Sequence, residues 1–413
     1  MAERTPLEVV VAGGGVAAAE LMLALHALAG RRVRMTLVAP NDTLDIRALH
    51  ALASVTGKTP PQPALQPIAV RSHARIEHTT LRRVLPGERL AELADGRRIG
   101  YDALVLATGA RRVAAYGEGV VTLGEDSEGD AISRVIGELH AGRVHSAAFV
   151  VPPGVAWTLP LYELALLTAQ RTAATAPRLT LVTPEQAPLA IFGQQAARAT
   201  AGLLARAGIE LQLGTYASVD APGWIALRPH EHVLEADHIV ALAHTAGRAP
   251  EGVPADAEGF VAVDDHGRVR EAEAIYAVGD VTTFPVKQGG LACQLADVVA
   301  TRLAAAAGAD VEPRTFRPVL RGQLLAGART LHLDSPIAGG SGGGMANVSS
   351  IWRPSHKVDA LYLSQMLEDE PGFAIPPVGV DVAIRLASPS ELEREPLALD
   401  PYSPLLDHGR VAR

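Results

Sequence analysis

The chain has 413 residues, enough for roughly two to three domains, and its formal net charge is −8. An acidic chain without long charge runs argues against a nucleic-acid-binding protein, because such proteins need a basic face to neutralise phosphates. Hydrophobic residues make up 48% of the sequence, which excludes a mainly disordered chain, and the single cysteine, Cys293, excludes an internal disulfide or a redox pair of cysteines.

The N-terminus predicts no signal peptide, because a short polar segment leads directly into an apolar strand pattern at Leu7. No apolar run reaches the ~18 residues that cross a bilayer. The histidines show neither an HExxH pattern nor close clustering with acidic residues. We therefore expect a cytoplasmic protein with no transmembrane segment and no metal site.

The first chemical signal is a strand, a turn and a helix near the N-terminus. Residues 7–12 have the pattern of a buried strand, and a helix is expected to extend to about residue 30. The turn between them has the GxGxxA form of a dinucleotide-binding fingerprint, made by Gly13, Gly14, Gly15 and Ala18. In such a turn Gly13 permits the tight bend, Gly15 lets the backbone approach a pyrophosphate and Ala18 lets the helix pack on the strand. The alternative is a purely structural glycine turn.

The next strand, residues 33–38, departs from the fingerprint at its end. A ribose-binding acid is expected there, but the chain continues with Ala39 and Pro40. Asp42 is the nearest acid that could bind the ribose, through a different loop path.

A second copy of this unit follows later in the chain. Residues 148–151 and 179–182 predict strands, and residues 159–168 predict the helix between them. Glu163 of the second copy aligns with Glu20 of the first. Two Rossmann-type halves in one chain are typical of flavoproteins that bind two dinucleotides.

The second copy has lost the features of a nucleotide site. Aligned on the two glutamates, the small positions of the fingerprint become Ala156, Thr158 and Leu161. Thr183 stands where an acid would bind ribose. We expect this half to keep the fold without ordinary NAD(P)H binding; NADH bound through a different loop is the alternative.

Two later motifs complete the pattern. A strand ends in Ala107, Thr108 and Gly109, and a late strand leads into Gly279 and Asp280. Together with the N-terminal turn, this order of motifs resembles the pyridine nucleotide-disulfide oxidoreductase superfamily over about residues 7–330. The resemblance implies bound FAD as cofactor, with the carboxylate of Asp280 on the flavin ribityl chain and the segment at Thr108 against the FAD. A turn or helix-capping aspartate is the alternative for Asp280.

The resemblance also implies roles for residues outside these motifs. Lys287 and the amides of Gln288 and Gly289 precede a predicted helix, whose N-terminus together with a lysine stabilises negative charge on reduced flavin. Lys287 is one of three lysines, and a surface lysine is the alternative. The resemblance places Arg47 near the FAD diphosphate and Leu81 at the cofactor.

Within the superfamily, the chain is most similar to sulfide:quinone oxidoreductases and type II NADH dehydrogenases, with Asp45 and Arg47 in a corresponding segment. Sulfide oxidation needs cysteines at the flavin, and Cys293 by itself favours a small buried helix residue. We therefore predict an FAD-dependent oxidoreductase that moves electrons from an unidentified small-molecule donor to a quinone-like or other acceptor. The alternatives are an NAD(P)H:acceptor oxidoreductase and a non-catalytic or redox-sensing partner with weakened FAD binding.

The expected fold is α/β, with two Rossmann-like domains and a C-terminal α+β interface domain. A helix over residues 359–367 carries an apolar patch that we assign to the core or to a homodimer contact rather than to a membrane surface. We predict an FAD domain at 1–112 and 246–312, a degenerate second domain at 113–245, an interface domain at 313–369 and a Pro-rich extended tail at 370–413.

Overall fold

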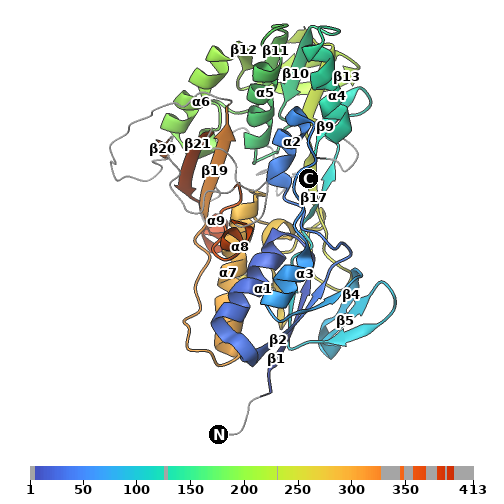
Figure 1. Cartoon of the computed structure of the whole chain (residues 1–413), viewed down its shortest axis with the longest axis vertical. Helices are drawn as coiled ribbons and strands as arrows, with labels where there is room; N and C mark the ends of the chain where they lie inside the picture. Colours follow the sequence, from blue (N-terminus) through green and yellow to red (C-terminus); the bar gives the residue numbers. More distant parts are fainter. Residues whose placement is uncertain are drawn as a thin grey trace, which may run out of the picture.

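The computed structural model describes residues 5–124, 129–229, 231–326, 345–347, 357–368, 379–386 and 388–394. Two α/β domains lie one above the other, and a smaller C-terminal sheet lies beside the upper domain (Figure 1). Within these ranges, none of the helices is long and apolar enough to cross a membrane.

The first domain is built on a five-stranded, all-parallel sheet. Its strand order is β18-β7-β1-β2-β3. The strands are β1 (Leu7–Ala12), β2 (Val33–Val38), β3 (Arg75–Glu77), β7 (Ala103–Leu106) and β18 (Ile275–Ala277). The helices of this domain are α1 (Val16–Ala29), α3 (Leu65–Arg71) and α7 (Gly289–Ala306), and α1 packs along α7.

The second domain repeats this arrangement strand for strand. Its parallel sheet has the order β12-β11-β10-β16-β9, which corresponds position by position to the first sheet. The strands are β9 (Val120–Leu123), β10 (Ser146–Val150), β11 (Arg178–Val182), β12 (Ile209–Gln212) and β16 (His238–Leu242). The helices are α4 (Gly129–His140), α5 (Leu159–Arg171) and α6 (Gln194–Arg206). The predicted internal repeat and the α/β class are confirmed.

Each parallel sheet is covered by a small antiparallel sheet on the face that the helices leave free. In the first domain this cover is β4 (Leu81–Leu85), β5 (Leu90–Leu93) and β6 (Arg98–Gly100). In the second it is β13 (Tyr216–Ala221), β14 (Trp224–Arg228) and β15 (His232–Glu235). The apolar residues of both sheets are therefore buried on both faces, which fits their continuous Val, Leu and Ala runs.

The two domains are joined by a pair of antiparallel strands, β8 (Ala110–Val113) and β17 (His244–Gly247). A short helix, α2 (His50–Thr56), leaves the first domain and packs against α4 and α5 of the second. The single-turn 3₁₀ helices are η1 (Gly30–Arg32), η2 (Arg47–Leu49), η3 (Pro86–Glu88), η4 (Ala190–Phe192) and η5 (Gly279–Val281).

The C-terminal part corrects two expectations. The extended tail expected from residue 370 contains a strand, β21 (Gly379–Arg385), and a helix, α9 (Pro389–Arg394). Strand β21 pairs with β19 (Val319–Leu325) and with β20 (Met345–Asn347), so it closes a sheet that the proline content of the segment concealed.

The helix expected over residues 359–367 is also shorter than predicted. Only α8 (Leu363–Leu367) is helical. The amides of Leu361, Tyr362 and Leu363 donate hydrogen bonds to the carboxylate of Glu20, and the helix begins only at Leu363. Leu363 and Leu367 are buried, which confirms the assignment of these two residues to the core.

Candidate functional site

A cavity of about 510 Å³ lies at the carboxyl ends of the first parallel sheet. In α/β proteins this edge of the sheet is where ligands bind. The wall is formed by the β1–α1 turn, the segment after β2, the end of β7, strand β8, η5 and the start of α7. The start of α5, strand β19 and the segment at Lys357 close it from the second domain and the C-terminal sheet.

The glycine turn shapes one end of the cavity. Gly13 has φ +119°, and a Cβ there would lie 2.1 Å from the carbonyl oxygen of Ala107, so no other residue fits. A Cβ on Gly15 would meet nothing within 4 Å. Gly13, Gly14 and Gly15 all line the cavity, whereas Ala18 is buried in α1. The turn therefore presents open backbone and a helix N-terminus to the cavity.

The predicted ribose contact of Asp42 is not supported. Asp42 is 80% exposed in its side chain, and its Oδ1 lies 2.8 Å from Nδ1 of His78. Asn41 and Thr43 line the cavity on either side of it. The chain after Pro40 turns the Asp42 carboxylate outward, so polar uncharged groups occupy the place where an acid was expected.

The two later motifs meet the glycine turn in space. Thr108, Gly109, Gly279 and Asp280 all line the cavity, as does Leu81. Gly109 has φ +68°, and a Cβ there would meet nothing within 4 Å, so this backbone too is open. The Oγ1 of Thr108 donates a hydrogen bond to the carbonyl of Arg248 at 2.9 Å, which holds the turn.

The residues before α7 also line the cavity, and contacts within the protein fix the side chain of Lys287. Lys287 Nζ donates to the carbonyl of Thr282 and lies 3.9 Å from the centroid of the Phe260 ring. Burial lowers the pKa of Lys287 to about 8, although the negative charge of Asp280 acts to raise it. Gln288 caps the helix by accepting a 2.8 Å hydrogen bond from the amide of Leu291. Gly289 completes this part of the wall.

A buried ion pair in the cavity wall was missed from the sequence. Lys357 Nζ binds the Glu163 carboxylate and the carbonyl of Gln323, and the side chains of the ion pair are only 5% and 2% exposed. Burial raises the pKa of Glu163, and the ammonium of Lys357 opposes this shift. Two features of the sequence could have pointed to this ion pair: Glu163 occupies the position of Glu20 in the repeat, and lysine is rare in the chain.

Basic residues dominate the charged lining of the cavity. Among the residues that the structure describes, five basic and three acidic side chains line it: Arg47, Arg112, Arg248, Lys287, Lys357, Asp45, Glu163 and Asp280. Arg47 was expected here; Arg112 and Arg248 were not. A positive cavity in a chain of net charge −8 favours an anionic ligand.

Comparison with known proteins identifies the architecture. A family model described as pyridine nucleotide-disulphide oxidoreductase matches residues 7–307. The chain belongs to this family. It is therefore an oxidoreductase of a class whose members in general are flavoproteins. No curated protein matches the sequence itself.

Solved structures show the same fold at low sequence identity. The oxidoreductase is similar to the sulfide:quinone oxidoreductase from Aquifex aeolicus, with 20% identity over 73% of this chain and 77% of that chain, and a TM-score of 0.66. A ferredoxin reductase from Rhodopseudomonas palustris gives 17% identity, 91% coverage of both chains and a TM-score of 0.59. NDH2 from Plasmodium falciparum, in a complex with NADH, gives 12% identity over 67% and 65%, and a TM-score of 0.55.

In the second domain of the oxidoreductase, Leu161 stands at one position of the fingerprint, and Tyr162 and Glu185 pack near it. Leu161 and Tyr162 are fully buried. The Tyr162 hydroxyl donates to Oε2 of Glu185 at 2.8 Å, and the Thr183 hydroxyl donates to the same oxygen at 3.1 Å. Burial raises the pKa of Glu185 to about 7. Glu185, the acid nearest the end of β11, therefore has its carboxylate turned into the domain.

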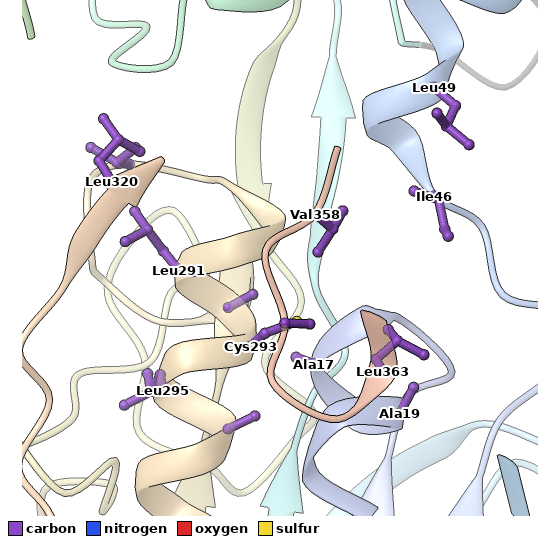
Figure 2. Close-up of a cluster of buried hydrophobic side chains, with 14 of the residues drawn as sticks. Ala17, Ala19, Ile46, Leu49, Leu291, Cys293, Leu295, Leu320, Val358 and Leu363 are labelled. Carbon is purple, nitrogen blue, oxygen red and sulfur yellow. The ribbon is translucent and has the colours of Figure 1, made fainter. Parts of the chain in front are cut away.

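The single cysteine of the oxidoreductase is a packing residue. Cys293 is fully buried in α7 among the side chains of α1 and of the segment that carries Val358 and Leu363 (Figure 2). Burial and the nearby charge of Glu20 raise the pKa of its thiol well above the ordinary value, so it carries little thiolate. The prediction of a small buried helix residue is confirmed.

Proposed function

We propose that this oxidoreductase binds FAD in the cavity and passes electrons from a small-molecule donor to a quinone-like or other small acceptor. The observation that carries the proposal is the continuity of one cavity. It is lined by the glycine turn and Asp280 and also by the Glu163–Lys357 pair. A dinucleotide-binding turn and a shielded ion pair in the wall of one cavity suit a cofactor that reacts with a second molecule.

The residues present fit the cofactor. The turn at Gly15 and the turn at Gly109 leave space where a side chain would project into the cavity. The N-terminus of α1 and the excess of basic side chains favour a diphosphate beside Gly15. Asp280 would accept hydrogen bonds from ribityl hydroxyls. FAD, when bound, supplies the hydride and electron transfer chemistry.

Lys287 and the N-terminus of α7 line the cavity and would stabilise negative charge on the reduced cofactor. The Glu163–Lys357 ion pair also lines the cavity, with both side chains shielded from bulk water.

Disulfide chemistry and ordinary NADH use are both disfavoured by the same structure. Cys293 lies in the core rather than at the cavity, so the proposed electron transfer involves no cysteine. Leu161 and the inward-turned Glu185 argue against a nicotinamide nucleotide in the second domain. A donor other than NADH follows from the proposal.

The visible spectrum of the purified protein tests the proposal. We expect bound flavin with its absorbance bands, no rapid bleaching by anaerobic NADH, and bleaching by another small-molecule reductant. Protein that rejects added FAD would contradict the cofactor assignment, and rapid bleaching by NADH would instead support the NAD(P)H:acceptor alternative.

A matched pair of variants separates binding from folding. Asp280→Ala should lose flavin, because Asp280 lines the cavity, whereas Asp42→Ala, which removes an exposed acid outside it, should keep full flavin content. Equal flavin content in both variants would count against the assigned role of Asp280.

A further inference from the structure

Trp157 is the only aromatic residue among the described residues that line the cavity. It lies in the segment between β10 and α5, so the second domain supplies it to a cavity at the edge of the first sheet. Trp157 is half-buried, and its ring meets that of Phe192 edge to face, with the ring centroids 5.9 Å apart and the ring planes inclined at 66°. We call Trp157 and Phe192 the aromatic corner of the cavity.

Phe192 stands directly behind the cavity wall. It is fully buried, and Gly322 of β19, which lines the cavity, leaves the space for its ring. A Cβ on Gly322 would lie 2.7 Å from Cζ of Phe192 and 2.8 Å from Cδ1 of Leu159, which is another lining residue. Side chains packed this closely transmit displacements to their neighbours, so the position of Phe192 fixes that of Trp157.

The single-turn helix η4, which ends at Phe192, is held from inside the second domain. Leu189, directly before η4, is buried and has φ +52°, a left-handed conformation that a leucine adopts only where its surroundings impose it. The amide of Phe192 donates to the carbonyl of Leu189 at 3.0 Å. The amide of Ala190 donates to the carbonyl of Ala187 at 3.1 Å and also to the carboxylate of Glu185. Glu185 therefore holds the start of η4.

Hydrogen-bond donors surround the carboxylate of Glu185. The hydroxyl of Tyr162 on α5 donates to its Oε2 at 2.8 Å, and the hydroxyl of Thr183, directly after β11, donates to the same oxygen at 3.1 Å. Tyr162 is the titratable group that faces Glu185, which forms no ion pair within the described part of the chain. Donors suit the ionised carboxylate, so protonation places a hydroxyl where an acceptor is needed and weakens the hold on Ala190. Burial raises the pKa of Glu185 to about 7, so this change falls near neutral pH.

We propose that Glu185 is a positioning residue that holds the aromatic corner in place through η4 and thereby sets how the small-molecule substrate fits against Trp157. A planar ring, such as that of a quinone, stacks well on an indole held in this way. The inference rests on the proposed binding of that molecule in the cavity and deepens it. Glu185 follows β11, near the place where the repeat predicts a ribose-binding acid. The half that has lost its nucleotide features thus uses this acid to shape the cavity of the other half.

The fluorescence of Trp157 tests the inference without a substrate. Replacing the other two tryptophans, by Trp224→Phe with Trp352→Phe, leaves Trp157 as the only one in the full-length protein. We expect its emission maximum and its quenching by acrylamide to change between about pH 6 and about pH 8, with a midpoint near the pKa of Glu185. Glu185→Gln in this background should remove the change. The control is Glu210→Gln, which replaces an exposed acid on β12 and should keep it.

Tyr162→Phe in the same background provides a second reading. The tyrosine hydroxyl stabilises the ionised carboxylate by donating to it, so its loss should raise the midpoint above that of the parent protein. A purely structural role of Glu185 predicts no such midpoint. Far-ultraviolet circular dichroism and thermal unfolding verify that each variant is folded.

The kinetics of the flavin-loaded protein connect the aromatic corner with the substrate. The flavin is reduced with dithionite and reoxidised by increasing concentrations of a water-soluble benzoquinone, which gains two electrons and two protons and becomes the hydroquinone. Glu185→Gln and Phe192→Leu should raise the half-saturating quinone concentration roughly 3- to 10-fold, because the corner no longer fits the ring. The maximal rate should stay within about twofold of the parent, with full flavin content. Glu210→Gln should react like the parent.

Two results would overturn the inference. The first is an emission of Trp157 that does not change with pH in the parent, or that changes equally in Glu185→Gln. The second is an unchanged half-saturating quinone concentration in Glu185→Gln, whatever its maximal rate. A protein without flavin, or a reduced flavin that the quinone does not reoxidise, would instead overturn the proposed function, while the emission of Trp157 still decides whether Glu185 holds the aromatic corner.

Discussion

Glu20 and Glu163 occupy equivalent positions in the two halves of the repeat, and both carboxylates bind the C-terminal part of the chain. Glu20 accepts hydrogen bonds from the amides of Leu361, Tyr362 and Leu363 at 2.6, 2.9 and 2.6 Å. Glu163 accepts one from the amide of Leu325 at 2.9 Å and binds Lys357. The repeated glutamate thus anchors the segment that forms part of the cavity wall.

The first prediction concerns this anchor. Glu20→Gln should lower the free energy of unfolding by about 1–3 kcal/mol, because hydrogen bonds to a buried charge are lost. The segment around Lys357 should also become sensitive to trypsin. Urea denaturation and limited proteolysis measure the two effects. Glu8→Gln removes an exposed carboxylate and is the control; equal behaviour of the two variants would show that Glu20 does not anchor the segment.

Asp297 of α7 adds a pH dependence to the anchor. Its Oδ1 is buried without a partner among the described residues, and burial together with the neighbouring Glu20 raises its pKa well above the ordinary value. An acid whose pKa is raised in the fold binds more protons folded than unfolded, so its contribution to stability falls as the pH rises. Stability should therefore decrease from about pH 5 to about pH 8.

The variant Asp297→Asn isolates this effect, because an asparagine has the same shape and does not ionise. We expect it to flatten the decrease in melting temperature over that pH range and to melt above the parent protein at the alkaline end. A melting temperature that falls with pH equally in the parent protein and in Asp297→Asn would contradict the raised pKa.

The buried pair Glu163–Lys357 predicts an asymmetry between single and double variants. Lys357→Met leaves a buried carboxylate without its partner and should cost about 3–5 kcal/mol of unfolding free energy. The double variant Glu163→Gln with Lys357→Met should recover most of this loss, since no buried charge remains. A double-mutant cycle by urea denaturation measures the coupling. Additive losses would mean that the two charges do not interact.

Much of the first domain and its site could be predicted because the signals are local. The strand–glycine–helix pattern places Gly13 and Gly15 from sequence alone, and the parallel topology then brings Asp280 to the same edge. The side-chain direction of Asp42 could not be predicted, because the loop after Pro40 turns its carboxylate toward His78.

Contacts between distant parts of the chain could not be predicted either, because no local pattern in the sequence indicates which segments meet. Lys357 meets Glu163 across 194 positions of sequence. Arg112 of β8 lies beside Gly124 of the second domain. The strand Gly379–Arg385 is mostly apolar, but its surroundings are rich in proline, and its pairing with β19 is needed to recognise it.

Substitution of Gly13 should lower the stability of the protein, whereas substitution of Gly15 should mainly lower its flavin content. Gly13→Ala places a Cβ 2.1 Å from the Ala107 carbonyl oxygen at a positive φ, so the apoprotein should lose more than about 2 kcal/mol of stability. Gly15→Val meets open space and should change the stability of the apoprotein by less than about 1 kcal/mol, while blocking the cofactor.

Thermal unfolding of the apoproteins and the flavin absorbance of the loaded proteins measure the two effects. Gly15→Val with normal flavin content would contradict the placement of the cofactor beside this turn, whatever the stability of Gly13→Ala.

Lys287 provides the last prediction, on the reduction potential. If its ammonium stabilises the reduced cofactor, Lys287→Met should lower the midpoint potential by about 20–40 mV at neutral pH, which corresponds to about 1–2 kcal/mol for a two-electron couple. Burial lowers the pKa of Lys287 to about 8, so the lysine of the oxidised protein loses its charge above that pH. The difference between the two proteins should therefore shrink as the pH rises past this value.

The control is Lys58→Met, which removes an exposed lysine that is not part of the cavity wall and should leave the potential unchanged. Potentiometric titration with redox dyes at several pH values measures all three proteins. The contact of Lys287 with Thr282 and Phe260 fixes its ammonium, so the effect on potential should not require any movement of the side chain. A potential of Lys287→Met equal to that of Lys58→Met would remove Lys287 from the proposed charge stabilisation and leave the N-terminus of α7 as its source.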